Sequence, residues 1–174
     1  MFILQFIAKI FKILRSDTSP KEIAIGFILG MVIGLTPFLS LHNFVIILII
    51  ILFSVNVSMA IFSFGIFSGV AYLFDPLFHD LGFLLLVDFN FLKGIWSSLY
   101  NVPVLALSRY NNTIVMGSLA SAIVLLLPCY IFMKKFVVVY REKLDPKFQK
   151  WKIVQTVKGS KIYTIYNKIR NWSE

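Results

Sequence analysis

Charged side chains and cysteine are scarce in this sequence. Only 14% of the 174 residues are charged and 59% are hydrophobic, with a mean hydropathy of +0.85, whereas soluble domains are about a quarter charged. A soluble core of this size cannot hide so much apolar surface, because such a domain still exposes about a third of its unfolded surface. The composition therefore excludes a water-soluble monomer and predicts a chain that a lipid bilayer solvates.

Several chemical signatures are also missing. Cys129 is the single cysteine, which excludes an internal disulfide and a multi-cysteine metal site. The sequence has no nucleophile elbow, phosphate loop, dinucleotide fingerprint or His-Glu-x-x-His zinc helix. Lys9, Lys12 and Arg15 follow the mostly apolar residues 2–7, the reverse of a secretory signal, so we expect no cleavage. We accordingly expect neither an enzyme nor a bound cofactor.

Positive charge is concentrated at the two ends of the chain. Residues 1–22 carry four basic and two acidic side chains, and residues 134–174 carry eleven basic and three acidic ones. Residues 23–133 between them carry only two basic and three acidic side chains. By the positive-inside rule, this distribution predicts that both termini are cytoplasmic and that the number of membrane crossings is even. Nucleic acid is a rival ligand for the tail cations and the aromatic rings among them. A membrane surface alone explains both, so we expect membrane lipids and no nucleic acid as partners.

Both ends of the chain also have the pattern of amphipathic helices, which lie in the membrane interface. One face of residues 2–15 is apolar and consists of Ile3, Phe6, Ile7, Ile10 and Leu14. A second apolar face, near the C-terminus, consists of Ile162, Ile165, Tyr166, Ile169 and Trp172. The chain therefore divides into an interfacial helix over residues 1–16, a membrane domain over 17–140 and a basic cytoplasmic tail over 141–174.

The uncharged run over residues 23–74 is broken at Thr36-Pro37 and again at Asn56, and Ser19 and Pro20 are typical of a helix start just before it. Its first two pieces, residues 23–35 and 44–55, have 13 and 12 residues, whereas a spanning helix needs about 20. Two arrangements stay open. Either the pieces form a re-entrant hairpin with its tip at residues 36–43, or the second continues through Asn56 to residue 74 as one tilted span.

The second half of the membrane domain is expected to be helical as well. Asp75-Pro76 is expected to end the preceding helix, and residues 77–109 to form two interrupted or in-plane helices. Residues 113–133 are 21 residues without a charge, opened by the cap-like Asn112, and predict a transmembrane helix. Asp145-Pro146 is typical of a further helix start. The predicted fold class is an all-α, polytopic helical membrane protein with a glycine-rich broken hairpin.

Small residues recur at helical spacing in two places. Gly26, Gly30 and Gly34 are four residues apart and leave a stripe without side chains. Gly117 and Ser121 form a second small-residue patch in the long apolar segment. Such stripes let helix backbones approach closely, so the two are candidate partners. Packing within the chain is favoured over a homodimer, although a homo-oligomer stays open.

Polar residues at the breaks are the candidate binding site, because bare backbone at membrane depth needs protein, water or a ligand to satisfy it. We expect the two breaks to converge on one pocket, with candidate residues Thr36, Pro37, His42, Asn43, Asn56, Asp75 and His79. The ordinary interpretation is that Asn43 caps a helix starting at Phe44 and that His42 meets a neighbouring carbonyl or water. Asp75 and His79 share a helical face, but metal sites need three or four convergent ligands, so no metal is expected. Arg109 is expected in a loop or an ion pair with Asp88.

The combination of motifs resembles a known family. It comprises Ser19-Pro20, the glycine series ending at Pro37, Leu41-His42-Asn43, Asn56 and Asp75-Pro76-Leu77-Phe78-His79. Together these resemble the bacterial membrane family called domain of unknown function 2062, and Tyr110-Asn111-Asn112-Thr113 is similar to its short stand-alone branch. The resemblance implies a bacterial cytoplasmic (inner) membrane protein and carries over no catalytic residues. Some relatives are joined to glycosyltransferases or accompany a larger envelope protein, which implies envelope biogenesis or lipid handling.

Three functions follow as hypotheses. The first is a non-enzymatic inner-membrane subunit for envelope biogenesis or lipid transport, which docks a larger partner or lipid headgroups at the broken-helix site. The second is a small transporter or lipid scramblase in which a re-entrant hairpin lines a polar path. The third is an intramembrane metal hydrolase that uses His42, Asp75 and His79.

Overall fold

The structure is a computed structural model that describes residues 10–103 and 108–146. This part of the chain is helical and contains no strand, which confirms the predicted all-α class. The α-helices are α2 (Pro20–Leu35), α3 (Leu41–Leu52), α4 (Val57–Phe83), α5 (Lys93–Tyr100) and α7 (Thr113–Val139). Shorter π or 3-10 turns cover Leu84–Asp88, Asn90–Leu92 and Tyr140–Leu144. Most of the predicted N-terminal interfacial helix and nearly all of the predicted tail lie outside the described residues.

Side-chain caps start three of the helices. Ser19 Oγ accepts a hydrogen bond from the Glu22 amide at 3.2 Å, with Pro20 as the first residue of α2. Asn56 Oδ1 accepts from the Met59 amide at 2.8 Å and starts α4. Asn112 Oδ1 accepts from the first amides of α7. Each cap satisfies amides that have no partner inside the helix. The predicted starts at Pro20 and Thr113 are confirmed, whereas Asn56 was expected only as a break.

Two helical stretches are long and apolar enough to span a membrane. They cover Val57–Asp88 and Thr113–Leu144, with 32 residues each, which exceeds the roughly 20 residues that a bilayer core requires. Large apolar side chains are exposed on both, among them Leu73 and Val124, which are 74% and 73% exposed. Leu52 on the shorter helix α3 is 68% exposed. A surface of this kind is compatible with lipid around the molecule.

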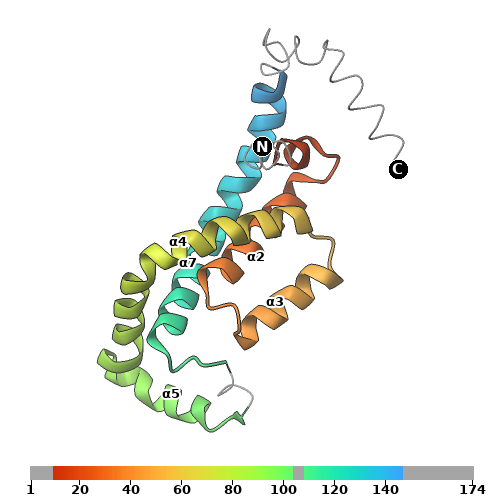
Figure 1. Cartoon of the computed structure of the whole chain (residues 1–174). Coiled ribbons are helices and arrows are strands. Elements are labelled where there is room, and N and C mark those ends of the chain that lie inside the picture. Colours follow the sequence, from red (N-terminus) through yellow and green to blue (C-terminus); the bar gives the residue numbers. More distant parts are fainter. Residues whose placement is uncertain (1–9, 104–107, 147–174) are drawn as a thin grey trace.

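One proline position differs from the sequence-based expectation. Pro76 does not end a helix at residue 75, because α4 continues through it to Phe83. The helix bends instead, as Figure 1 shows between its yellow and green parts, since proline cannot donate a bond to the Tyr72 carbonyl. Asp145 and Pro146 are helical and follow directly on the turn Tyr140–Leu144, and the helix predicted to start there falls otherwise on residues outside the described part of the chain. Between α4 and α7 the described residues form short turns and helix α5, and residues 104–107 of the stretch in which two helices were expected lie outside the described part.

Helices α2, α4 and α7 pack together, and α3 lies outside them (Figure 1). Helix α2 runs parallel to α4, because Gly26, Gly30 and Gly34 face Asn56, Ala60 and Phe64 in turn. Helix α3 returns from the far end of α2, and the Asn56 amide then lies 3.4 Å from the Glu22 carbonyl oxygen. The α2–α3 hairpin therefore begins and ends at the same level of the molecule.

Helix α4 contacts both α2 and α7 at places where the backbones of the helices approach each other closely. A Cβ atom on Gly30 would lie 2.8 Å from the Ala60 carbonyl carbon, and one on Gly34 would lie 2.8 Å from the Phe64 oxygen. Farther along α4, a Cβ on Gly82 would lie 2.6 Å from the Thr113 carbonyl carbon, and one on Gly117 2.7 Å from that of Phe78. No side chain fits at these places without displacing backbone.

The sequence suggested that the two small-residue patches pack against each other. In the structure each of them packs against α4 instead. The α2 glycines contact the first half of α4, whereas Gly117 contacts its second half. Ser121 on α7 is half-buried. Spacing shows which face of a helix is bare, but it does not show which neighbour uses that face.

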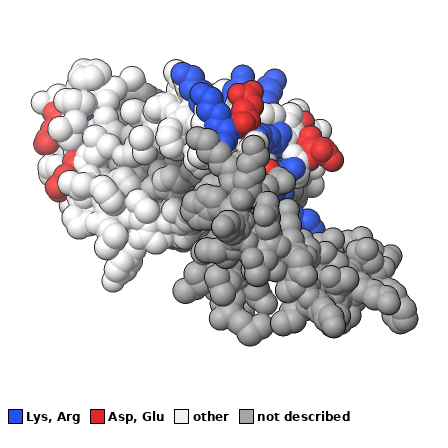
Figure 2. Space-filling view, turned by 90° about the horizontal axis from the view of Figure 1, so that it is seen from above, with Lys and Arg blue, Asp and Glu red and all other residues white. Residues whose placement is uncertain are grey.

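The two ends of the described chain lie side by side (Figure 1). The Arg141 guanidinium donates to the carbonyl oxygens of Leu14 and Thr18 at 2.7 and 2.8 Å, and Arg15 forms an ion pair with Asp145. Figure 2, which views this end, shows basic and acidic side chains gathered in one region. The rest of the visible described surface is uncharged apart from a few acidic side chains at the opposite edge. The charged residues near the two described ends thus share one end of the molecule.

We predict that Gly30→Ala destabilises the protein and that Gly65→Ala does not. The added methyl group on Gly30 collides with the Ala60 backbone, and overpacking of this kind costs about 1–3 kcal/mol. A Cβ on Gly65, in contrast, meets nothing within 4 Å, so alanine there adds only helix propensity. Thermal unfolding of both variants in detergent measures the difference. Equal melting temperatures would show that the α2–α4 contact is looser than described.

Candidate functional site

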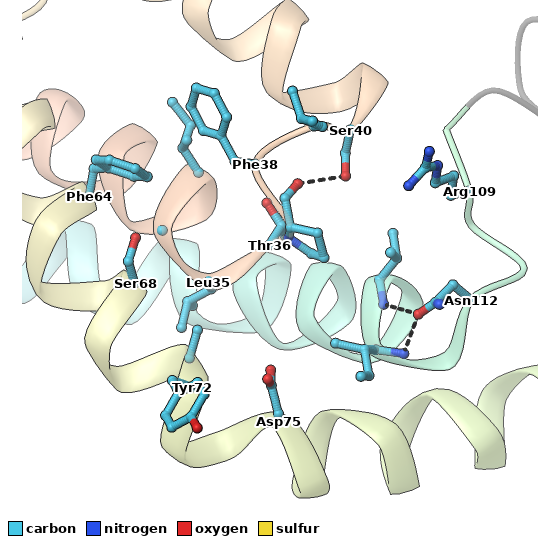
Figure 3. Close-up of a pocket in the computed structure, with 17 residues that line it drawn as sticks. Leu35, Thr36, Phe38, Ser40, Phe64, Ser68, Tyr72, Asp75, Arg109 and Asn112 are labelled. Carbon is cyan, nitrogen blue, oxygen red and sulfur yellow. Dashed lines mark hydrogen bonds between the residues drawn. The ribbon is translucent and has the colours of Figure 1, made fainter.

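A cavity of about 520 Å³ lies between the α2–α3 turn, the middle of α4 and the start of α7 (Figure 3). Its walls are mostly apolar and include Leu35, Phe64 and Ile114. Its polar side chains come from all three elements and include Thr36, Ser40, Ser68, Asp75, Arg109 and Asn112. The volume is in the range of about 300–1,000 Å³ that small-molecule sites occupy. Apolar walls with a few polar groups are the usual composition of such a site.

The α2–α3 turn is closed by its own hydrogen bonds. The amide of Asn43, which is fully buried, donates to the carbonyl oxygens of Pro37 and Phe38 at 3.0 and 3.3 Å. The Thr36 hydroxyl lies within hydrogen-bonding distance of Asn43 Oδ1 and the Val32 carbonyl oxygen. Ser40 Oγ donates to the Pro37 oxygen at 2.7 Å. These bonds satisfy the backbone where the helix is broken and fix the upper edge of the cavity.

Asn43 therefore has a different role from the cap that the ordinary interpretation assigned to it. Helix α3 begins at Leu41 rather than Phe44, with Ser40 at the cap position. The Asn43 side chain turns back toward the carbonyls of the break instead of toward the amides that follow. A carboxamide suits this position because it donates two hydrogens and accepts at its oxygen.

Asp75 enters the cavity from α4. It is half-buried, and Figure 3 shows its carboxylate directed toward the α2–α3 turn. Within the described residues Asp75 forms no salt bridge. The bend at Pro76 lies next to it, so the same stretch of helix supplies both the carboxylate and a change of direction.

Arg109 enters from the turn before α7. Its φ of 56° is the one positive φ of a non-glycine residue in the described chain. A backbone of this kind costs of the order of 1 kcal/mol, and such residues cluster at functional sites. In Figure 3 the Arg109 guanidinium is directed from this turn toward the cavity, above Asn112. A cation and the amide end of α7 therefore lie on one side of the cavity.

The structure brings together only part of the predicted site. Thr36, Pro37 and Asp75 line the cavity, and Asn43 closes the turn behind it. His42 is half-buried beside the turn, and its buried Nε2 has no hydrogen-bond partner in the described structure. Asn56 is not in the cavity and caps α4 at the other end of the hairpin.

His79 lies elsewhere too, and its Nδ1 is 2.7 Å from Thr113 Oγ1, a contact that joins α4 to α7. The three residues proposed for metal chemistry, His42, Asp75 and His79, do not surround one point. In residues 10–103 and 108–146 no group of three or more His, Cys, Asp or Glu side chains is placed to hold a metal ion.

Sequence reasoning did not connect Arg109, Ser68 or Asn112 with the site. Asn112 was recognised as a helix cap, but a cap alone does not indicate a cavity. Arg109 was grouped with Asp88 because both are charges in an apolar region. It lies in an irregular turn, where no periodic pattern predicts the direction of a side chain.

A second, shallower cavity of about 450 Å³ lies at the far end of the molecule and includes Trp96, Asn101 and Tyr110. Trp96 Nε1 donates to the Leu85 carbonyl oxygen at 3.0 Å, and the Tyr110 hydroxyl donates to the Trp96 carbonyl oxygen at 2.9 Å. These bonds connect α5 with the turn Leu84–Asp88 that follows α4 and with the turn that precedes α7. Amphipathic aromatic rings in such a place are typical of a membrane interface.

The helices and the cavity define an all-helical protein with two membrane-length segments and a broken hairpin. The chain belongs to the family described as "Uncharacterized protein conserved in bacteria (DUF2062)", which matches residues 4–144 and confirms the resemblance. A protein of Treponema pallidum (strain Nichols), described as "Uncharacterized protein", is 28% identical over 138 residues. That alignment covers 79% of this chain and 85% of the relative. No solved structure matches.

We predict that Asn43→Leu lowers stability much more than Phe44→Leu. Leucine has a similar size but leaves the Pro37 and Phe38 carbonyls without their donor, at about 1–3 kcal/mol for each buried group left unpaired. Phe44 is the neighbouring residue and is 62% exposed, so its replacement is the matched control. Thermal unfolding in detergent compares them. A small loss for Asn43→Leu would contradict the closed turn.

Proposed function

We propose that this chain is a multi-pass protein of the bacterial inner membrane that binds the headgroup of a membrane lipid in the cavity at the α2–α3 turn. In this proposal it is a non-enzymatic subunit that serves a larger envelope protein in envelope biogenesis or lipid transport. The observation that carries it is the cavity itself, in which polar groups from three elements meet between apolar walls. An amphiphile needs both kinds of surface at once.

The outside of the molecule supports a lipid ligand over a soluble one. Phe38 and Leu39 at the turn are 54% and 71% exposed, although they flank the polar groups of the cavity. An exposed apolar rim next to a polar interior is a liability in water, and in a bilayer it contacts acyl chains. A headgroup in the cavity would leave its acyl chains beside this rim.

In the proposed topology, α4 and α7 cross the membrane, the α2–α3 hairpin is re-entrant, and both termini are cytoplasmic. Helices α2 and α3 have 16 and 12 residues, which is short of the roughly 20 that a crossing needs. The hairpin starts and ends at one level, where Asn56 meets Glu22. Arg141 and Leu14 meet at the same end, and the basic flanks favour the cytoplasmic side.

Labelling of single cysteines tests this topology in a Cys129→Ala background. We predict that Lys12→Cys, Ser54→Cys and Lys143→Cys react with an impermeant maleimide only when the cytoplasmic side is open to it. Gly94→Cys is the matched reporter for the other side, and all four positions are exposed in the structure. Labelling of Ser54→Cys together with Gly94→Cys would refute the re-entrant hairpin and favour a full crossing.

Lipid retention tests the function. We predict that the purified wild-type chain retains a phospholipid in native mass spectrometry and that Ser68→Trp reduces this retention, because the indole fills the cavity that Ser68 lines. Ser98→Trp is the control, since it makes the same change on an exposed position of α5. Equal lipid retention by the two variants, or none by the wild type, would contradict a lipid site in this cavity.

A lipid scramblase or small transporter is the second candidate. The observation that favours it is the broken helix at Thr36 and Pro37, which lies directly beside a polar cavity, as in transporters with discontinuous helices. Reconstitution in liposomes distinguishes the two proposals. Flux of lipid or solute across the bilayer supports the scramblase or transporter, and its absence supports the lipid-binding subunit. The metal-hydrolase hypothesis gains no support from His42, Asp75 and His79, which do not converge.

A further inference from the structure

We propose that the cavity selects a zwitterionic headgroup that carries both a phosphate and an ammonium group, with the ammonium at Asp75 and the phosphate at Arg109. This inference rests on the proposed function, because it names the chemical class of the lipid headgroup. It follows from the distribution of charge inside the cavity, which has two differently charged sides.

The side at Asp75 is negative. The carboxylate of this half-buried residue points toward the turn that ends α2 (Figure 3). The last residues of α2, Ile33, Gly34 and Leu35, line the same cavity. A helix ends in carbonyl groups that lack partners inside the helix and carry partial negative charge. A carboxylate and a carbonyl end together favour a cation that can donate several hydrogen bonds, as a primary ammonium does.

The side at Arg109 is positive. Its guanidinium is directed into the cavity from the turn that precedes α7, and α7 begins at Thr113 with Asn112 as its cap. The amide end of a helix carries partial positive charge and favours anions. Arginine adds a planar fork of donors that matches two oxygens of a phosphate. Thr36 also lines the cavity and lies above Asp75 in Figure 3, with its hydroxyl near Asn43 Oδ1.

Asp75 and Arg109 form no salt bridge with each other or with another residue of the described chain. Its one salt bridge joins Arg15 to Asp145 at the far end of the molecule. Both Asp75 and Arg109 reach the cavity from separate elements, α4 and the turn before α7. A ligand with only a negative charge would meet attraction at Arg109 and repulsion at Asp75, whereas a zwitterion complements both. The position of Asp75 therefore disfavours an anionic lipid that has no amine.

The test uses the full chain in nanodiscs of equal phosphatidylethanolamine and phosphatidylglycerol, followed by mass spectrometry of the lipids retained after extraction. We expect the wild type to enrich phosphatidylethanolamine about tenfold, the ratio expected for one charge-assisted interaction. Asp75→Asn should bring the retained lipids back to the bulk ratio while leaving total retention measurable. Arg109→Gln should reduce retention of both lipids. Asp80→Asn is the control, because it makes the same change on an exposed position of α4 outside the cavity.

Two results would overturn the inference: retention in the bulk ratio by the wild type, or an unchanged preference in a folded Asp75→Asn variant. Neither result alters the comparison of Ser68→Trp with Ser98→Trp, which tests lipid binding itself. Soluble phosphoethanolamine is added as a competitor to separate the two sources of this chemistry. If phosphoethanolamine displaces phosphatidylethanolamine when both are at the same concentration, the cavity recognises the free ammonium-phosphate group. If phosphatidylethanolamine stays bound, the membrane lipid is the source.

Discussion

The close approach of the α2 and α4 backbones is the constraint on which the rest of the structure depends. At Gly30 the neighbouring helix occupies the space where any other residue would carry a side chain, so the two helices have one relative position in which they fit. This contact makes α2 and α4 parallel, and two parallel helices that follow each other in sequence need a returning segment between them. Helix α3 is that segment, which explains why it lies outside the packed helices and exposes so much of its surface.

The cavity results from the different lengths of the packed helices. Helix α2 stops at Leu35, whereas α4 continues to Phe83 and α7 begins beside its second half. The space beyond the end of α2 is therefore bounded by helices on two sides and by the α2–α3 turn above. A helix that stops among apolar neighbours leaves backbone groups to be satisfied, and Asn43 and Ser40 satisfy those of the turn. The carboxylate of Asp75 and the guanidinium of Arg109 have no comparable structural partner in the described residues.

Features encoded by neighbouring residues could be predicted from the sequence, whereas those that depend on distant residues could not. The helix starts at Pro20 and Thr113 follow from caps a residue away, and the bare face of α2 follows from its glycine spacing. The partner of that face is α4, which no local pattern specifies. Pro76 was taken as an end because proline breaks helices in water, but packed neighbours allow a helix to continue with a bend. Thr36 and Asp75 do share a cavity, whereas Asn56 and His79 serve as a cap and as a link between helices.

The two tight crossings hold α4 at two places, near Ala60 against α2 and near Phe78 against α7. At both crossings the nearest atoms are mostly backbone, which has no rotamers to adjust when the helix is strained. The bend at Pro76 lies between Ala60 and the last contact at Gly82, on the stretch that carries Asp75. A straighter or more sharply bent α4 would therefore move the start of α7 relative to the end of α2. Because the end of α2 also packs directly against α7, the bend of α4 and this contact together set the width of the cavity.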